Sequence, residues 1–253
     1  MSDLTLQLAI GILIGLSAGY IGSFMVLRKM SLVGDALSHV ALPGVALGLI
    51  FGFNPILGAF ATLFAGITGI WLIEHKTELP VDSLVGLFFT ISLAVGVLIT
   101  PDEHLVEALF GDISKISAPD VFLSVAISLV VILIMRHISK GFILGTISKD
   151  LAKSTGINVS KDNFIFLLLI AAIVALGIKT VGTLLMGALV IIPAIASKNI
   201  SLGMRHYTAR AGIIGSLSMV GGIIVASTLG LPPGPLVVLI SAGVFLVTLV
   251  LKR

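Results

Sequence analysis

Long apolar runs recur along this chain, and they restrict its fold more than any single motif does. Several contain roughly 18 or more apolar residues, enough for a helix to cross the ~30 Å hydrocarbon core of a membrane. Charged residues make up 11% of the 253 residues, whereas soluble domains have about 25%. In lipid every backbone polar group needs an internal partner, so helices are the expected spanning elements. We predict an all-α polytopic membrane protein with about nine transmembrane helices, and the pattern allows eight to ten.

The apolar runs and the basic residues together predict the topology. The spans are expected at 5–27, 31–53, 55–73, 81–99, 119–135, 163–178, 182–197, 211–229 and 234–251. With nine spans and the N-terminus outside, all but two of the 15 Lys and Arg residues fall on the cytoplasmic side, as the positive-inside rule requires. We expect one transmembrane domain, 1–253, whose C-terminus is cytoplasmic. It would have an outer loop at 100–118 and a cytoplasmic loop at 136–162.

The charge balance and the missing motifs exclude several classes of function. The net charge of +3 is explained by basic loop residues that set the topology, so no nucleic-acid partner is expected. The chain has no cysteine, which excludes disulfides and thiolate metal ligands. The P-loop and H-E-x-x-H motifs are also missing, and we predict that the chain is not an enzyme. If transport is driven by ATP, a separate subunit must hydrolyse it.

The stretch SLVGDALSHVALPGV, 31–45, places two ionisable residues inside a predicted span. Asp35 and His39 are four residues apart and therefore share one face of a helix. A charge this deep costs at least about 2.5–3.5 kcal/mol and is rare without a partner or a water-filled path. Imidazole and carboxylate suit zinc, manganese or ferrous iron. Two ligands are too few for a closed site, since structural zinc uses about four, and a symmetric homodimer would supply a second pair.

The residues after this pair predict a weak point in the helix, and other interpretations of the pair stay open. Pro43 and Gly44 favour a break, because proline removes a backbone hydrogen bond. In a purely structural interpretation, Asp35 lies at the interface and His39 bonds a neighbouring carbonyl. A secondary transporter driven by an ion gradient would also use a broken helix near the midplane. An intramembrane enzyme with His39 as base or metal ligand is a third interpretation.

Six sequence blocks resemble a known family. They are MSLVGDALSHVALPGVALG (30–48), VDSLVGLFF (81–89), LFGDI (109–113), TISKDLAKSTGI (146–157), VGTLLMGALVIIPAIAS (181–197) and LPPGPLVVLIS (231–241). In this order they resemble the permease subunits of bacterial and archaeal ABC transporters for zinc, manganese and iron. The resemblance covers nearly the whole chain.

The resemblance implies a type II ABC-importer-like permease that works as a homodimer in the prokaryotic plasma (inner) membrane. Its expected partners are cytoplasmic ATP-binding cassette subunits and an extracytoplasmic metal-binding protein. Asp35 and His39 would bind the transported divalent metal, and no permanently bound cofactor is expected. The residues expected to couple to the ATPase are Ser148, Lys149, Asp150, Leu151, Ala152 and Gly156. The V-D-S-L-V-G and F-G-D sequences look more like zinc members and L-P-G more like manganese members, and we expect zinc.

Overall fold

The computed structural model describes residues 3–77, 79–101, 108–111, 113 and 116–252, and every regular element in this part of the chain is a helix. The helices are α1 (Asp3–Leu27), α2 (Val33–Val40), α3 (Leu42–Phe51), α4 (Pro55–Thr77), α5 (Val81–Ile99), α7 (Ala118–Ile147), α8 (Lys149–Ser154), α9 (Val159–Val181), α10 (Met186–Ile200), α11 (Met204–Leu229) and α12 (Pro233–Val250). Among the described residues, eight segments are long and apolar enough to cross a membrane, with α2 and α3 forming one of them. The shorter apolar helix α10 is a ninth. The predicted all-α polytopic fold is confirmed.

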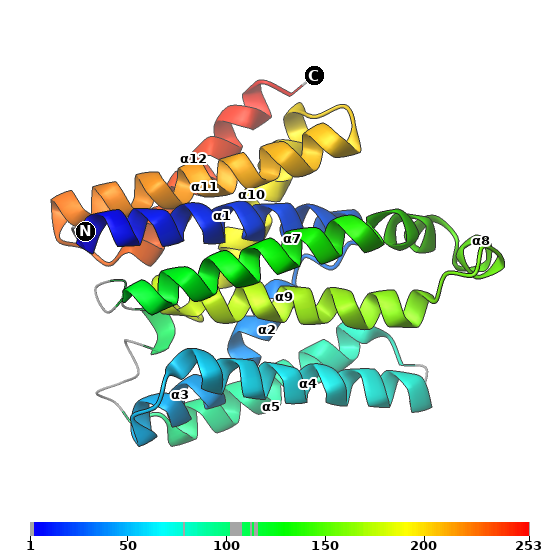
Figure 1. Cartoon of the computed structure of the whole chain (residues 1–253), viewed down its shortest axis with the longest axis horizontal. Coiled ribbons are helices and arrows are strands. Elements are labelled where there is room, and N and C mark those ends of the chain that lie inside the picture. The colour runs from blue at the N-terminus through cyan, green and yellow to red at the C-terminus, as the bar shows by residue number, and fades with distance from the viewer. Residues whose placement is uncertain (1–2, 78, 102–107, 112, 114–115, 253) are drawn as a thin grey trace.

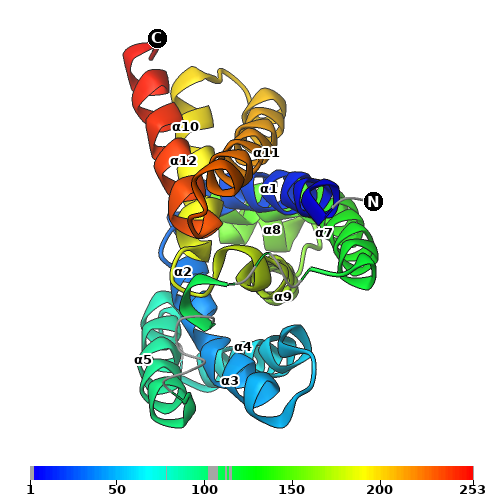
Figure 2. The same ribbon diagram turned by 90° about the vertical axis from the view of Figure 1, so that its left-hand side faces the viewer.

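The helices form two groups, and α2 links them (Figures 1 and 2). One group contains α1, α7, α9, α10, α11 and α12, and the other contains α3, α4 and α5. α2 contacts α9 and α10 in the first group and α4 and α5 in the second. The helix that carries Asp35 and His39 therefore lies in the middle of the molecule.

Small residues explain how the first group packs. α1 makes its most extensive contact with α11, and a Cβ atom placed on Gly15 would lie 2.5 Å from the carbonyl oxygen of Gly215. Gly19 approaches the backbone of Ala211 in the same way. Such close backbone contact replaces the hydrophobic effect that lipid does not supply between helices. The order of these contacts also makes α1 and α11 antiparallel.

The two termini lie at opposite ends of the helix bundle. Because α1 and α11 are antiparallel, α11 begins beside the end of α1. Ser197 near the end of α10 donates a hydrogen bond to the carbonyl of Tyr207 near the start of α11. Asn199 of α10 lies 3.3 Å from Thr248 near the end of α12. The C-terminus is therefore at the end of the molecule where α1 finishes, which agrees with an odd number of crossings that includes α10.

The segment predicted as a cytoplasmic loop, 136–162, is mostly helical. α7 continues to Ile147, α8 follows, and α9 begins at Val159. The predicted span ended near 135 because Arg136 interrupts the apolar run, but a helix can leave the membrane without losing its backbone hydrogen bonds. For the same reason α11 begins at Met204 instead of 211. In the predicted outer loop, 100–118, residues 102–107, 112, 114 and 115 lie outside the described residues.

Candidate functional site

The short helix α2 is buried at every position except Asp35, which is half-buried. It follows the turn that ends α1, in which Lys29 has a φ of +62°. Asp35 lies in the first turn of α2 and His39 in its last turn. A carboxylate near the N-terminus and a basic group near the C-terminus both suit the helix dipole. The helix dipole therefore favours these positions for Asp35 and His39, but it does not explain their burial.

His39 is held in an apolar position with an unsatisfied ring nitrogen. Its side chain is 7% exposed, and its ring packs in a T-shaped arrangement with Phe89 of α5, with 5.2 Å between the ring centroids. The Nδ1 atom is buried and has no hydrogen-bond partner. Leaving such an atom unpaired costs about 1–3 kcal/mol. The interpretation in which a neighbouring carbonyl satisfies the ring does not hold for this nitrogen.

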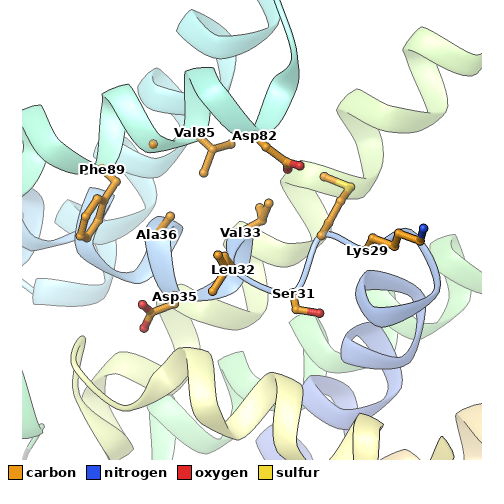
Figure 3. A pocket seen from close by; sticks show the side chains of 11 residues that line it. Lys29, Ser31, Leu32, Val33, Asp35, Ala36, Asp82, Val85 and Phe89 are labelled. Atoms are coloured by element: carbon orange, nitrogen blue, oxygen red, sulfur yellow. The ribbon is translucent and has the colours of Figure 1, made fainter.

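Asp35 borders a pocket of about 350 Å³ between α2 and α5. Figure 3 shows Asp35 and Asp82 among the side chains around it. On another side, Asp35 lies against Gly187 of α10, where an added Cβ would be 2.6 Å from both the Cα and the Cβ of Asp35. Reasoning from sequence missed Gly187, because the clearance between two helices distant in sequence leaves no local pattern.

The helix break lies two residues before Pro43. α2 ends at Val40, and α3 begins at Leu42 with Pro43 in its first turn. Pro43 has no N–H to donate to the carbonyl of His39, four residues earlier, and this is where the two helices separate. Gly44 lies inside α3 and approaches the carbonyl oxygen of Gly58 on α4. Gly44 thus permits close packing of α3 on α4 within a continuous helix.

The donor set of one chain is too small for a closed metal site. Within the described part of the chain, no group of three or more His, Cys, Asp or Glu side chains could hold a metal ion. Asp35 and His39 offer an oxygen and a nitrogen, which fit a first-row divalent cation. Structural zinc uses about four ligands, so a single chain would hold such a cation only weakly.

The residues predicted to couple to an ATPase form α8 and its two ends, at one end of the molecule and away from the central α2 (Figure 1). Ser148 is the N-cap, and its hydroxyl accepts a hydrogen bond of 3.2 Å from the Leu151 N–H. Gly156, after the end of the helix, has a φ of +79°, a conformation that glycine adopts easily. Ala152 is buried, whereas Asp150 and Leu151 are exposed. The predicted segment therefore has an anchored side and a free surface.

Arg28 joins the end of α1 to the helices on either side of α8, a role that the sequence did not reveal. Its Nε donates to Thr146 Oγ1 at 2.9 Å, and its Nη1 donates to Asn163. Its guanidinium lies 3.8 Å from the centroid of the Phe142 ring. Burial lowers the pKa of Arg28 to about 10, while Asp162 acts in the opposite direction, so the group is charged at neutral pH. These contacts connect the base of the α7–α9 pair to the turn that leads into α2.

Comparisons with known proteins point to a single family. The profile of the ABC 3 transport family matches residues 3–252. The high-affinity zinc uptake system membrane protein ZnuB of Haemophilus influenzae is 34% identical over 246 residues, covering 94% of each chain. The manganese transport system membrane protein MntC of Listeria monocytogenes is 28% identical over 250 residues, covering 97% of this chain and 89% of that protein. The structure of PsaBC from Streptococcus pneumoniae in complex with Fab gives a TM-score of 0.86 at 26% identity, covering 98% of this chain and 91% of that chain.

Proposed function

The chain belongs to the ABC 3 transport family, and from this membership we propose that it imports a divalent transition metal into the cytoplasm by alternating access. It is a metal ABC transporter permease and a multi-pass protein of the prokaryotic plasma (inner) membrane. We favour zinc over manganese or iron, because the 34% identical relative is named for zinc and two of the sequence blocks look more like zinc members.

Asp35 and His39 are the residues that we assign to the transported metal. The observation that carries this assignment is the buried Nδ1 of His39, which has no partner although it lies one helical turn from a carboxylate. When this nitrogen binds a cation, no hydrogen bond has to break. An incomplete ligand set also suits a transit site, since the metal must leave again.

A homodimer would complete the ligand shell. Two copies of the Asp35–His39 pair facing each other across a two-fold axis would give four ligands, about the number that zinc uses. Cytoplasmic ATP-binding cassette subunits would supply the energy, because the chain has no P-loop. An extracytoplasmic metal-binding protein would deliver the metal.

The free surface of α8 is the proposed docking site for the ATPase. Asp150 and Leu151 are exposed there, and the positive-inside rule places α8 on the cytoplasmic side. Movement of α8 would reach α2 through α7, Arg28 and the turn after α1. This path lets ATP-driven closure of the motor open and close the metal site.

Metal uptake in cells tests the site assignment. Asp35→Ala and His39→Ala should each abolish uptake of radiolabelled zinc in a strain that expresses the chain with its ATPase and binding protein. His206→Ala, at an exposed position of α11, is the matched histidine control and should leave uptake unchanged. Immunoblots of the membrane fraction must show equal amounts of each variant. Normal uptake by both site variants would refute the assignment.

The runner-up function is a secondary transporter, and it predicts a different result in liposomes. The purified chain alone should then accumulate zinc when an ion gradient is applied. An ATP-driven importer should accumulate none until ATPase subunits and ATP are supplied.

A further inference from the structure

The pocket beside Asp35 ends at an aromatic side chain. Its α5 side is formed by Asp82, Val85, Gly86 and Phe89, whose spacing places them on one face of the helix. Figure 3 shows Lys29 and Phe89 at opposite ends of the lining. The pocket therefore runs along α5 from the turn after α1 and stops at the Phe89 ring.

Phe89 lies between His39 and the pocket. Asp35 lines the pocket, but His39 is not among its lining residues. Phe89 lines the pocket and also packs edge-on against the His39 ring. The Phe89 ring thus contacts both the His39 ring and the cavity that Asp35 lines, whereas His39 itself does not line that cavity.

The other end of the pocket adjoins a polar cavity. This second cavity has a volume of about 930 Å³, and both cavities are lined by Met30 and Asp82. Glu74 and His75 also line it. Carboxylate oxygens and an imidazole nitrogen, which can bind a divalent cation, therefore line the path from the Asp35 pocket into the second cavity. The Phe89 ring is the apolar barrier between His39 and this route.

The Phe89 ring has room to move. A Cβ placed on Gly86, three residues earlier on α5, would meet no other atom within 4 Å. Helical side chains lean towards the N-terminus and cover the preceding turn, so the space at Gly86 is within reach of the ring. Turning the ring there would break only an aromatic contact and no hydrogen bond.

We propose that Phe89 is a plug in the cation path. In the conformation described here its ring closes His39 off from the Asp35 pocket. When the ring turns towards Gly86, His39 and Asp35 can face the same divalent cation. The nature of this ligand rests on the proposed function, whereas the separation of His39 from the pocket does not.

The rate of thiol labelling at position 39 measures how far Phe89 blocks access to it, and the experiment needs no metal. The chain has no cysteine, so His39→Cys and Ala36→Cys each create a single reactive site, behind the plug and within the pocket respectively. The full chain in lipid nanodiscs is treated with a small cationic methanethiosulfonate reagent. H39C should react at least tenfold faster when combined with F89A, whereas A36C should react at the same rate with and without F89A.

Two matched variants separate the plug from general loosening of the fold. F88A removes the same ring from the adjacent position, which packs against Gly69 of α4, and should not change the labelling rate of H39C. G86L fills the space beside the plug and should slow H39C labelling further. Size-exclusion profiles must match the parent protein, and F89L serves as a milder variant if F89A does not fold.

The outcomes distinguish the plug from the proposed function. Rapid H39C labelling with Phe89 in place, or equal acceleration by F88A and F89A, would overturn the plug. If F89A alone accelerates labelling but cells show no metal uptake that depends on Asp35 and His39, the plug stands and the proposed function is wrong. If uptake depends on both residues but labelling ignores F89A, the proposed function stands and the plug is wrong.

Discussion

At the scale of single residues, the candidate metal site depends on clearance as much as on ligands. An added Cβ on Gly187 would lie 2.6 Å from the Cα of Asp35, closer than two carbon atoms can pack. α10 can therefore lie against α2 only when this position has no side chain. Asp35 can occupy its position because Gly187 on α10 has no Cβ atom.

We predict that Gly187→Ala weakens metal binding. The new methyl group would push α10 away from Asp35, and such overpacking typically costs about 1–3 kcal/mol. If that shift moves the carboxylate, metal affinity should fall about tenfold or more, since each 1.4 kcal/mol is roughly a factor of ten. Equilibrium binding of zinc to the purified protein measures the change.

The control for this prediction is Gly243→Ala in α12, where an added Cβ meets no other atom within 4 Å. Its metal affinity should equal that of the parent protein, and its helix should gain up to about 1 kcal/mol from the better propensity of alanine. Parent-like affinity in Gly187→Ala would show that the close approach does not position Asp35.

The sequence singled out the two candidate ligands but not their neighbours, and the reason is physical. Asp35 and His39 stand out because their spacing and their expected depth in the membrane are both local properties. Gly187 and Phe89 matter only because α10 and α5 pack against α2. A glycine or a phenylalanine in an apolar helix is too common to signal such a contact by itself.

At the scale of elements, α8 depends on its N-cap. A helix of six residues is too short to be stable in water alone, and Ser148 satisfies one of its free N–H groups. We predict that Ser148→Ala frays α8, because loss of such a cap costs about 1 kcal/mol. In the complex with the ATPase subunits, the number of metal ions imported per ATP hydrolysed should fall.

Ser154 provides the control for the cap. It lies at the other end of α8 and donates to the Leu151 carbonyl of its own helix. Ser154→Ala removes the same hydroxyl without removing a cap, so it should retain the parent ratio of metal to ATP. Equal losses in the two variants would mean that the cap is not what matters.

Helix existence was predictable from the sequence, but helix ends were not. Hydropathy located all the apolar segments, because the membrane requires long apolar runs. It placed the ends of α7 and α11 wrongly, because Arg136 and Arg210 mark where the helix surface becomes polar, while the backbone continues as a helix. The break at Ala41 was placed close to its position because Pro43 leaves a local signal.

At the scale of the whole molecule, the distribution of charge and the arrangement of the termini agree. The bias of Lys and Arg predicted an odd number of crossings, and the antiparallel packing of α1 on α11 leads to termini at opposite ends. The homodimer remains a proposal, because hydropathy and charge describe one chain in a membrane and do not define the surface that meets a second copy.

We predict that one metal ion binds per two chains. Each chain contributes Asp35 and His39, and no larger ligand group exists within the described residues, so a tight site needs both copies. Metal analysis of the purified protein should give about half an equivalent per chain, as two-fold sharing of one site requires. In a mixed dimer with Asp35→Ala and His39→Ala in one copy only, the affinity should fall at least about tenfold.

The mixed dimer has to be made by co-expression. Because the termini lie at opposite ends, a direct fusion of two copies would force the second copy into the reverse orientation in the membrane. Two chains with different affinity tags, purified in succession, avoid this constraint, and a pair of parent chains with the same two tags is the control. One metal ion per chain, or parent affinity in the mixed dimer, would show that each chain holds its metal alone. The shared site would then have to be abandoned, and ligands would have to be sought within a single chain.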